Sequence, residues 1–406
     1  MRSCYAIFLS LLLLSLCATA ADPQGAKLSS PPLAGPWVEE ATLTNTIGCC
    51  DNGLAVAING NTVAVSPVGV FVAVYVKPAD GWHSMTQTAI LSPSNLSAAP
   101  NFGSSIAIAG NTIVVGCDQA TVGSNLYQGA LYVFVEPAGG WTNMTETAIL
   151  TASNGVEDDL LGVSVAISGN TIVGGADSGA YVFTKPAGGW VTGTQTAKLT
   201  STSPSQLGHV AVAGNTVVAS AEVSGPAQGG VIVFVEPSTG WTDMTETATL
   251  DTGVETVSGV VGLVISGDTV VGGEPDISPN GVSHAGAVYV WVKPAAGWRN
   301  MSPTAELTAS NGNVNASLGV GVGINSAAIV AGAPRANVGS NREQGAVYVF
   351  NKPAGGWRNM TESSELTLSG GTSASLFGDS LSLSGGTLVG GAPFTASGGA
   401  AYLFGQ

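Results

Sequence analysis

Few residues in this sequence have the type and spacing that catalysis or metal binding requires. The three histidines, His83, His209 and His284, lie far apart, and none belongs to a metal-ligand spacing such as HxxxH. Neither a GxSxG nucleophile motif nor a Walker loop occurs. Two carboxylates from different loops, such as Asp118 and Asp158, would act as general acid and base only if the fold brought them together. We therefore expect a protein that is not an enzyme, with a polysaccharide hydrolase or lyase as a less favoured alternative.

Three long insertions, residues 118–129, 275–286 and 334–345, offer side chains for contact with a partner. Loops of this kind commonly carry binding function, because a rigid scaffold can hold them while their sequences vary. The alternative is that they are ordinary solvated loop residues. The candidate binding residues are Asp118, Tyr127, His284, Arg335, Arg342 and Glu343.

One acidic triplet and three cysteines complete the candidate chemistry. Glu157, Asp158 and Asp159 could hold a cation weakly, or they could simply keep a loop hydrated. After removal of a leader the remaining cysteines are Cys49, Cys50 and Cys117. An exported chain permits one disulfide, either Cys50 to Cys117 or a vicinal Cys49 to Cys50 bridge, and small buried thiols are the competing interpretation.

Composition and the N-terminus indicate where the chain works. Arg2 precedes an apolar run at residues 6–16 and a small-residue cleavage site at residues 18–20, which predicts a signal peptide over residues 1–20. A flexible segment over 21–34 and one repeat domain over 35–406 would follow. The formal charge is −15, from 11 Lys plus Arg against 26 Asp plus Glu, so nucleic-acid binding has no electrostatic support. We expect a monomer that is secreted, or that resides in the periplasm or at the cell surface, and that does not insert into membranes.

A tryptophan turn recurs along the chain and sets the fold. Its seven copies are about 53 residues apart, a period typical of propeller blades, at Trp37, Trp82, Trp141, Trp190, Trp241, Trp298 and Trp357. Each unit contains a glycine-turn hairpin such as residues 103–115, then a third strand such as 130–135 with two apolar faces, then a fourth strand. The pattern predicts an all-β, seven-bladed propeller of four-stranded antiparallel blades.

The two ends of the repeat domain indicate how the ring closes. Residues 37–44 match a turn and a fourth strand, whereas the last unit ends near Phe404 after its third strand. We therefore expect the N-terminal strand to complete the last blade. The variable loops after second and fourth strands would then share one face of the ring.

The hairpins resemble the FG-GAP repeat of integrin α-chain propellers and of secreted bacterial relatives. The motifs that carry this resemblance are Phe102-Gly103, Phe377-Gly378, Gly332-Ala333-Pro334 and Gly391-Ala392-Pro393. The resemblance implies an extracellular protein-binding or adhesion module. Many members of the family hold calcium in the turn between the first two strands, but here the turn is reduced to sequences such as Asn59-Gly60-Asn61, too short to wrap an ion. We therefore expect no cofactor.

A carbohydrate-binding, lectin-like propeller is the main alternative function, because seven near-identical units could repeat one pocket between blades. The turn tryptophans could also stack on sugar rings. The fixed position of each tryptophan beside a Gly or Pro favours a structural role instead. The partner is accordingly expected to be an extracellular protein or polysaccharide. Three N-x-S/T sequons, at Asn143, Asn300 and Asn359, occupy one repeat position, so duplication accounts for them unless the host glycosylates.

Overall fold

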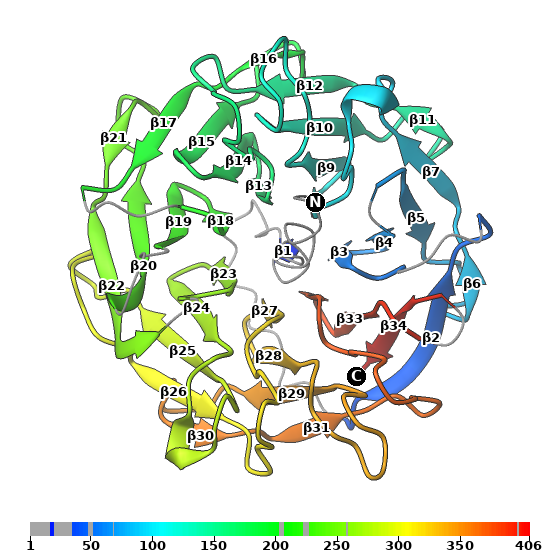
Figure 1. The fold of residues 1–406 in the computed structure, drawn as a ribbon, viewed down its shortest axis with the longest axis vertical. Helices are drawn as coiled ribbons and strands as arrows, with labels where there is room; N and C mark the ends of the chain where they lie inside the picture. The colour runs from blue at the N-terminus through cyan, green and yellow to red at the C-terminus, as the bar shows by residue number, and fades with distance from the viewer. Residues whose placement is uncertain are drawn as a thin grey trace, which may run out of the picture.

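The computed structural model describes residues 17–19, 35–47, 52–67, 69–202, 207–221, 227–256, 259–395 and 398–406. In these residues seven β-sheets stand around a common axis (Figure 1). The only helical elements there are two short 3-10 turns, η1 (Leu96–Ala98) and η2 (Pro279–Gly281). The predicted all-β, seven-bladed propeller is confirmed.

The first four blades follow each other along the chain, each an antiparallel sheet of four main strands. Blade 1 is β3 (Ala55–Asn59), β4 (Thr62–Ser66), β5 (Val72–Val76) and β7 (Ala89–Ser92). Blade 2 is β8 (Ser105–Ala109), β9 (Thr112–Cys117), β10 (Ala130–Val135) and β12 (Ala148–Thr151). Blade 3 is β13 (Ser164–Ser168), β14 (Thr171–Ala176), β15 (Gly179–Thr184) and β17 (Ala197–Thr200). Blade 4 is β18 (Val210–Ala213), β19 (Thr216–Ala221), β20 (Ala227–Val235) and β22 (Ala248–Thr256).

The last three blades repeat this order, and the seventh borrows a strand from the N-terminal side. Blade 5 is β23 (Gly262–Ser266), β24 (Thr269–Glu274), β25 (Ala287–Val292) and β26 (Ala305–Thr308). Blade 6 is β27 (Val322–Ile324), β28 (Ala328–Ala333), β29 (Ala346–Asn351) and β31 (Ser364–Leu366). Blade 7 is β32 (Leu381–Ser384), β33 (Thr387–Ala392), β34 (Ala400–Gly405) and β2 (Val38–Thr44).

The ring closes where β2 pairs with β34. The two strands are antiparallel, with Val38 opposite Gly405 and Leu43 opposite Ala401. Figure 1 shows β2, in blue, along the outer side of the red strands β33 and β34. The predicted closure of the last blade by the N-terminal strand is confirmed.

A fifth, two-residue strand links most neighbouring blades at the rim. It follows the tryptophan turn and pairs in parallel with the outer strand of the preceding blade, as Met144 does with Leu91. These strands are β6 (Met85–Thr86), β11 (Met144–Thr145), β16 (Gly193–Thr194), β21 (Met244–Thr245) and β30 (Met360–Thr361). At these five boundaries the neighbouring blades are therefore hydrogen-bonded at the outside of the ring.

The cores lie between the blades, as the two apolar faces of each third strand predict. In β10, Tyr132 and Phe134 pack against blade 1, whereas Leu131 and Val133 pack against blade 3. Phe102, from the loop that enters blade 2, meets the Tyr132 ring edge-on at a centroid distance of 5.3 Å. Such aromatic pairs add to the stabilisation that burial of the rings already provides.

The turn tryptophans are part of these cores. Trp82, Trp141, Trp190, Trp241, Trp298 and Trp357 are only 5–9% exposed. Their rings lie within the interblade clusters, which confirms the structural interpretation. Stacking on a sugar needs an exposed ring face, so these tryptophans do not support a sugar-stacking array.

Little of the predicted N-terminal leader belongs to the described residues. A short strand, β1 (Cys17–Thr19), pairs in parallel with β8 and lies near the axis of the ring (Figure 1). Residues 1–16 and 20–34, with the predicted cleavage site at Ala20, are outside the described part of the chain. Among the described residues, no helix has the length and apolar character that crossing a bilayer requires.

Candidate binding surface on the loop face

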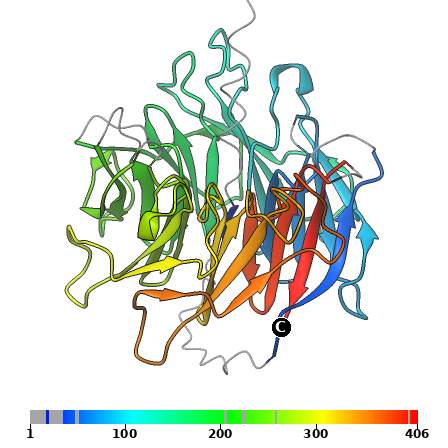
Figure 2. The ribbon, with the colours of Figure 1, turned by 60° about the horizontal axis from the view of Figure 1, so that its bottom comes forward.

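The ring has two unlike faces. The turn face carries the connections after first and third strands, and the loop face carries those after second and fourth strands. Figure 2 shows long cyan and green loops rising from one side of the ring, while the C-terminus lies on the other.

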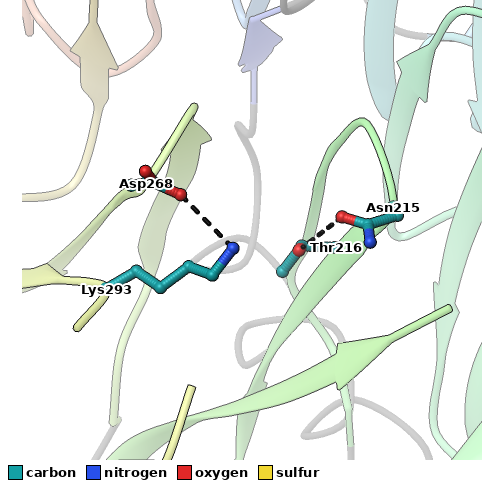
Figure 3. A network of polar contacts seen from close by, with 4 residues as sticks. All are labelled: Asn215, Thr216, Asp268 and Lys293. Carbon is teal, nitrogen blue, oxygen red and sulfur yellow. Dashed lines mark hydrogen bonds and ion pairs between the residues drawn. The ribbon is translucent and has the colours of Figure 1, made fainter. Parts of the chain in front are cut away.

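On the turn face, two polar pairs interact within their own blades. In the turns of blades 4 and 5, Lys293 Nζ lies 3.4 Å from Asp268 Oδ1, and the Thr216 hydroxyl donates to Asn215 Oδ1 at 3.3 Å (Figure 3). The first-strand turns are two-residue hairpins, as predicted, since Asn59 pairs with Thr62 and the tip residue Gly60 has a φ of 56°. Such short turns leave little on this face that could surround a ligand.

Two of the long loops on the loop face share one internally braced design. In blade 2, Asn125 Nδ2 donates to Gln128 Oε1 and to the Gly155 carbonyl. In blade 6, Asn341 Nδ2 donates to Gln344 Oε1 and to the Gly371 carbonyl. Both glutamines are buried. The brace fixes each loop to the next interblade loop, so the loop tips are held rigidly.

The tip of the blade 2 loop presents apolar side chains to solvent. Leu126 is 49% exposed and Tyr127 is 44% exposed, and Val156 on the adjoining loop is 58% exposed. The two loops lie side by side because the Asp158 and Leu160 amides donate to the carbonyls of Leu126 and Tyr127, each at 3.0 Å. We call the exposed set Leu126, Tyr127, Val156, Glu157 and Asp158 the blade 2 crown.

The other predicted loop residues gather on blades 5 and 6, away from this crown. His284, Arg335, Arg342 and Glu343 are all exposed. The His284 carbonyl accepts from the Ser317 amide, and the Arg335 amide donates to the neighbouring Ala316 carbonyl, so one interblade loop connects the two insertions. The structure therefore places the predicted binding residues in two groups on the same face.

Asp118 does not belong to the exposed part of either group. It is buried at the base of the blade 2 loop, where Asn101 Nδ2 donates to Asp118 Oδ1 at 2.8 Å. Burial raises the pKa of its carboxyl, and the hydrogen bond from Asn101 partly offsets that rise. Asp158, in contrast, lies exposed in the crown. These environments favour a structural role for Asp118.

Cys117 also lies at this base, as a buried free thiol. Its Sγ donates to the Pro100 carbonyl at 3.1 Å. Burial, helped by the nearby Asp118 carboxylate, raises the pKa of the thiol above its usual range. The other cysteines of the predicted bridges, Cys49 and Cys50, lie outside the described residues.

The acidic triplet divides between surface and interior. Glu157 and Asp158 are exposed, but Asp159 is buried and accepts from the Tyr181 hydroxyl and the Ser178 amide, both at 3.0 Å. Asp159 thus fastens the loop to blade 3. Within the described segments, no three His, Cys, Asp or Glu side chains come together in a way that could hold a metal ion.

Two buried titratable groups lie near the boundary between blades 4 and 5. His209, directly before β18, is buried, and burial lowers its pKa to about 4. Glu274, the last residue of β24, is fully buried, and neither of its carboxyl oxygens accepts a hydrogen bond from a described residue. Burial, together with the Asp251 carboxylate, raises the pKa of Glu274 to about 7, while the nearby Thr252 hydroxyl opposes the rise.

Sequence reasoning missed several residues that shape this face. Leu126 and Val156 contribute to the crown, and Asn125 and Gln128 hold it in place. One signal was available: the pattern VGSNxxQG occurs at residues 122–129 and again at 338–345. A braced loop repeated in two blades explains that pattern.

Comparison with known proteins agrees with the geometry. The family model described as FG-GAP repeat matches residues 85–134, 144–183 and 301–350. Among curated proteins, none matches this sequence.

One solved structure shows the same kind of fold. The WD40 β-propeller domain of Doa1 is similar with a TM-score of 0.55 and 13% identity, over 91% of this chain and 97% of that one. The computationally designed Ika8 protein has a TM-score of 0.48 and 14% identity, over 90% of this chain and 99% of that one. Hsv2 of Kluyvelomyces marxianus has a TM-score of 0.47 and 10% identity, over 82% of this chain and 85% of that one. At these identities the likeness concerns the fold alone. With family matches in three places on a ring of seven like blades, this chain is a seven-bladed β-propeller that contains FG-GAP repeats.

Proposed function

We propose that this propeller is a secreted, non-enzymatic binding module that grips an extracellular protein with its loop face. One observation carries the proposal. Ten large apolar side chains are exposed in the described residues; two of them, Val38 and Val191, follow tryptophan turns on the turn face. The other eight lie in the loop face: Ile47, Val70, Leu96, Leu126, Tyr127, Val156, Val314 and Phe394. Exposed apolar side chains gathered on one face are typical of protein-binding surfaces.

Other features support this proposal. The loop tips are held by hydrogen bonds, so binding would order few side chains and cost little conformational entropy. The N-terminal leader pattern supports export. The proposal includes no cofactor and no catalytic step: Asp118 is buried and hydrogen-bonded to Asn101 at the base of its loop, whereas Asp158 lies exposed in the crown.

A face-blocking experiment tests the proposal. Ser124 on the loop face and Ser238 on the turn face are both exposed, and each can be replaced by cysteine in a chain with Cys49 and Cys50 changed to serine. A large polyethylene glycol chain is attached to the new thiol. Binding is then measured on immobilised extracellular matrix proteins and polysaccharides.

We expect micromolar binding to a protein of the panel. Polyethylene glycol at position 124 should abolish this binding, and polyethylene glycol at position 238 should leave it intact. The proposal would be contradicted if no protein of the panel binds, or if only polyethylene glycol at position 238 abolishes binding. Binding to polysaccharides alone would favour the lectin alternative.

A further inference from the structure

We propose that the blade 2 crown docks a basic segment of the partner protein that also carries apolar side chains. The crown consists of Leu126, Tyr127, Val156, Glu157 and Asp158. This inference rests on the proposed function and specifies the chemistry of the partner. It follows from the apolar exposure, the local charge and the rigidity of these two loops.

The apolar side chains of the crown lie on two loops that run side by side. The amide of Asp158 donates to the Leu126 carbonyl, which brings the loop that carries Val156 beside the one that carries Leu126 and Tyr127. All three apolar side chains are about half exposed. A partner that covers them removes this area from water, the largest favourable term in most protein association.

The charge around the crown is predominantly negative. The described loop-face residues of blades 1 to 3 contain no Lys or Arg, but they contain five carboxylates: Asp118, Glu157, Asp158, Asp159 and Asp177. One positive charge adjoins them from blade 3, where Lys198 Nζ of β17 donates to Ser178 Oγ at 2.8 Å and lies 5.1 Å from the Tyr181 ring centre.

The carboxylates interact with one another at this place. The Asp177 amide donates to the Asp159 carbonyl at 2.9 Å, which brings Asp177 beside the acidic loop. Burial, together with the Asp159 and Asp158 carboxylates, raises the pKa of Asp177. A negative field of this kind attracts a cationic partner and rejects an acidic one.

The backbone holds the crown in one shape. Tyr127 and Asp158 both have left-handed φ angles, 54° and 62°, a conformation that few side chains adopt without support. The support comes from the Asn125 and Gln128 brace. A patch fixed in advance loses little entropy when a partner binds.

The loop of blade 6 supplies an internal control. It has the same brace, and Glu343, in the position of Tyr127, has a φ of 53°. Its tip residues are Arg342 and Glu343 in place of Leu126 and Tyr127. The dipeptide Arg-Glu is therefore known to fit this backbone, so the double substitution L126R/Y127E removes the apolar tip without disturbing the loop.

The test uses three fluorescein-labelled synthetic peptides of alternating sequence: arginine with leucine, glutamate with leucine, and arginine with serine. Their binding to the full chain is followed by fluorescence anisotropy. We expect the arginine–leucine peptide to bind at least about tenfold more tightly than either of the others. L126R/Y127E should weaken that binding by about tenfold or more and leave the thermal midpoint unchanged.

Charge variants separate the crown from the net charge of the protein. E157Q/D158N should weaken the arginine–leucine peptide several-fold and reduce the salt dependence of its binding. D80N/E136Q, an equal change on the turn face, should leave binding unchanged.

The inference is overturned if the glutamate–leucine peptide binds equally well, if D80N/E136Q weakens binding as much as E157Q/D158N, or if L126R/Y127E has no effect. If those results appear while a polyethylene glycol chain at position 124 still abolishes binding to the protein panel, the inference fails and the proposed function stands. If no protein of the panel binds at all, both the inference and the proposed function are contradicted.

Discussion

Gly332 of blade 6 lies directly against Gly378 of blade 7, so that a Cβ on Gly332 would stand 1.9 Å from the Gly378 carbonyl oxygen. The Gly378 amide in turn donates to the Gly391 carbonyl of its own blade at 3.0 Å. Gly378 belongs to the FG element of the motif, and Gly332 and Gly391 belong to GAP elements. The two halves of the motif thus form the contact between neighbouring blades, and only glycine permits this approach.

Gly332→Ala is expected to destabilise the protein by about 2–3 kcal/mol, because the added methyl group forces the blades apart. Gly355→Ala is the matched control, since nothing lies within 4 Å of a Cβ at that position in the tryptophan turn. Urea unfolding of both variants measures the difference. Equal free energies of unfolding for the two would contradict this account of the motif.

Glu274 makes stability depend on pH. Its pKa is raised from 4.5 to about 7, so the folded state keeps a proton that the unfolded state has released. The free energy of unfolding should therefore fall as pH rises from about 4.5 to 7 and stay level above that, with a total loss of up to about 3 kcal/mol.

Glu274→Gln removes this titration and should abolish that part of the pH dependence. The variant keeps the size of the side chain, whereas alanine would match the equivalent positions Ala176, Ala221, Ala333 and Ala392 in other blades. Unfolding curves at several pH values between 4 and 8 provide the comparison. A wild-type profile parallel to that of the Gln variant would show that Glu274 is ionised in the fold.

The sequon residue Asn143 is expected to stabilise the rim of the ring. Its Oδ1 accepts from the Ile90 amide of the preceding blade at 2.9 Å, and Asp243 does the same for the Lys198 amide at 2.7 Å. Asn143→Ala should cost about 1 kcal/mol, while Asn143→Asp should be nearly neutral because a carboxylate serves at the equivalent position. Thermal unfolding distinguishes them, and an equal loss for both would argue against the hydrogen bond as the cause.

The strand pattern could be predicted because it is periodic. Glycine turns such as Gly110-Asn111 and the two apolar faces of residues 130–135 indicate hairpins and sandwiched sheets without any knowledge of distant contacts. The tryptophan interval then fixes the number of blades. The unmatched ends, near Trp37 and Phe404, determine the closure.

Features that depend on neighbouring blades could not be predicted in this way. The rim strand Met144–Thr145 is too short to show a period, and its partner Leu91 lies in another blade. Asp159 reads as one of three surface acids, although a hydrogen bond from Tyr181 holds it inside. The burial of Glu274 likewise arises from contacts that a linear sequence does not display.

The most direct test of the ring is a covalent link across its closure. Thr42 of β2 lies directly opposite Tyr402 of β34. In a chain with Cys49 and Cys50 replaced by serine and Cys117 by alanine, the pair T42C/Y402C should form an intramolecular disulfide in the folded protein, detected by mass spectrometry without reduction. The control pair T42C/Y348C, which places the second thiol in blade 6, should remain reduced. Failure of the first pair to link, or linkage of the second, would contradict the closed seven-bladed ring.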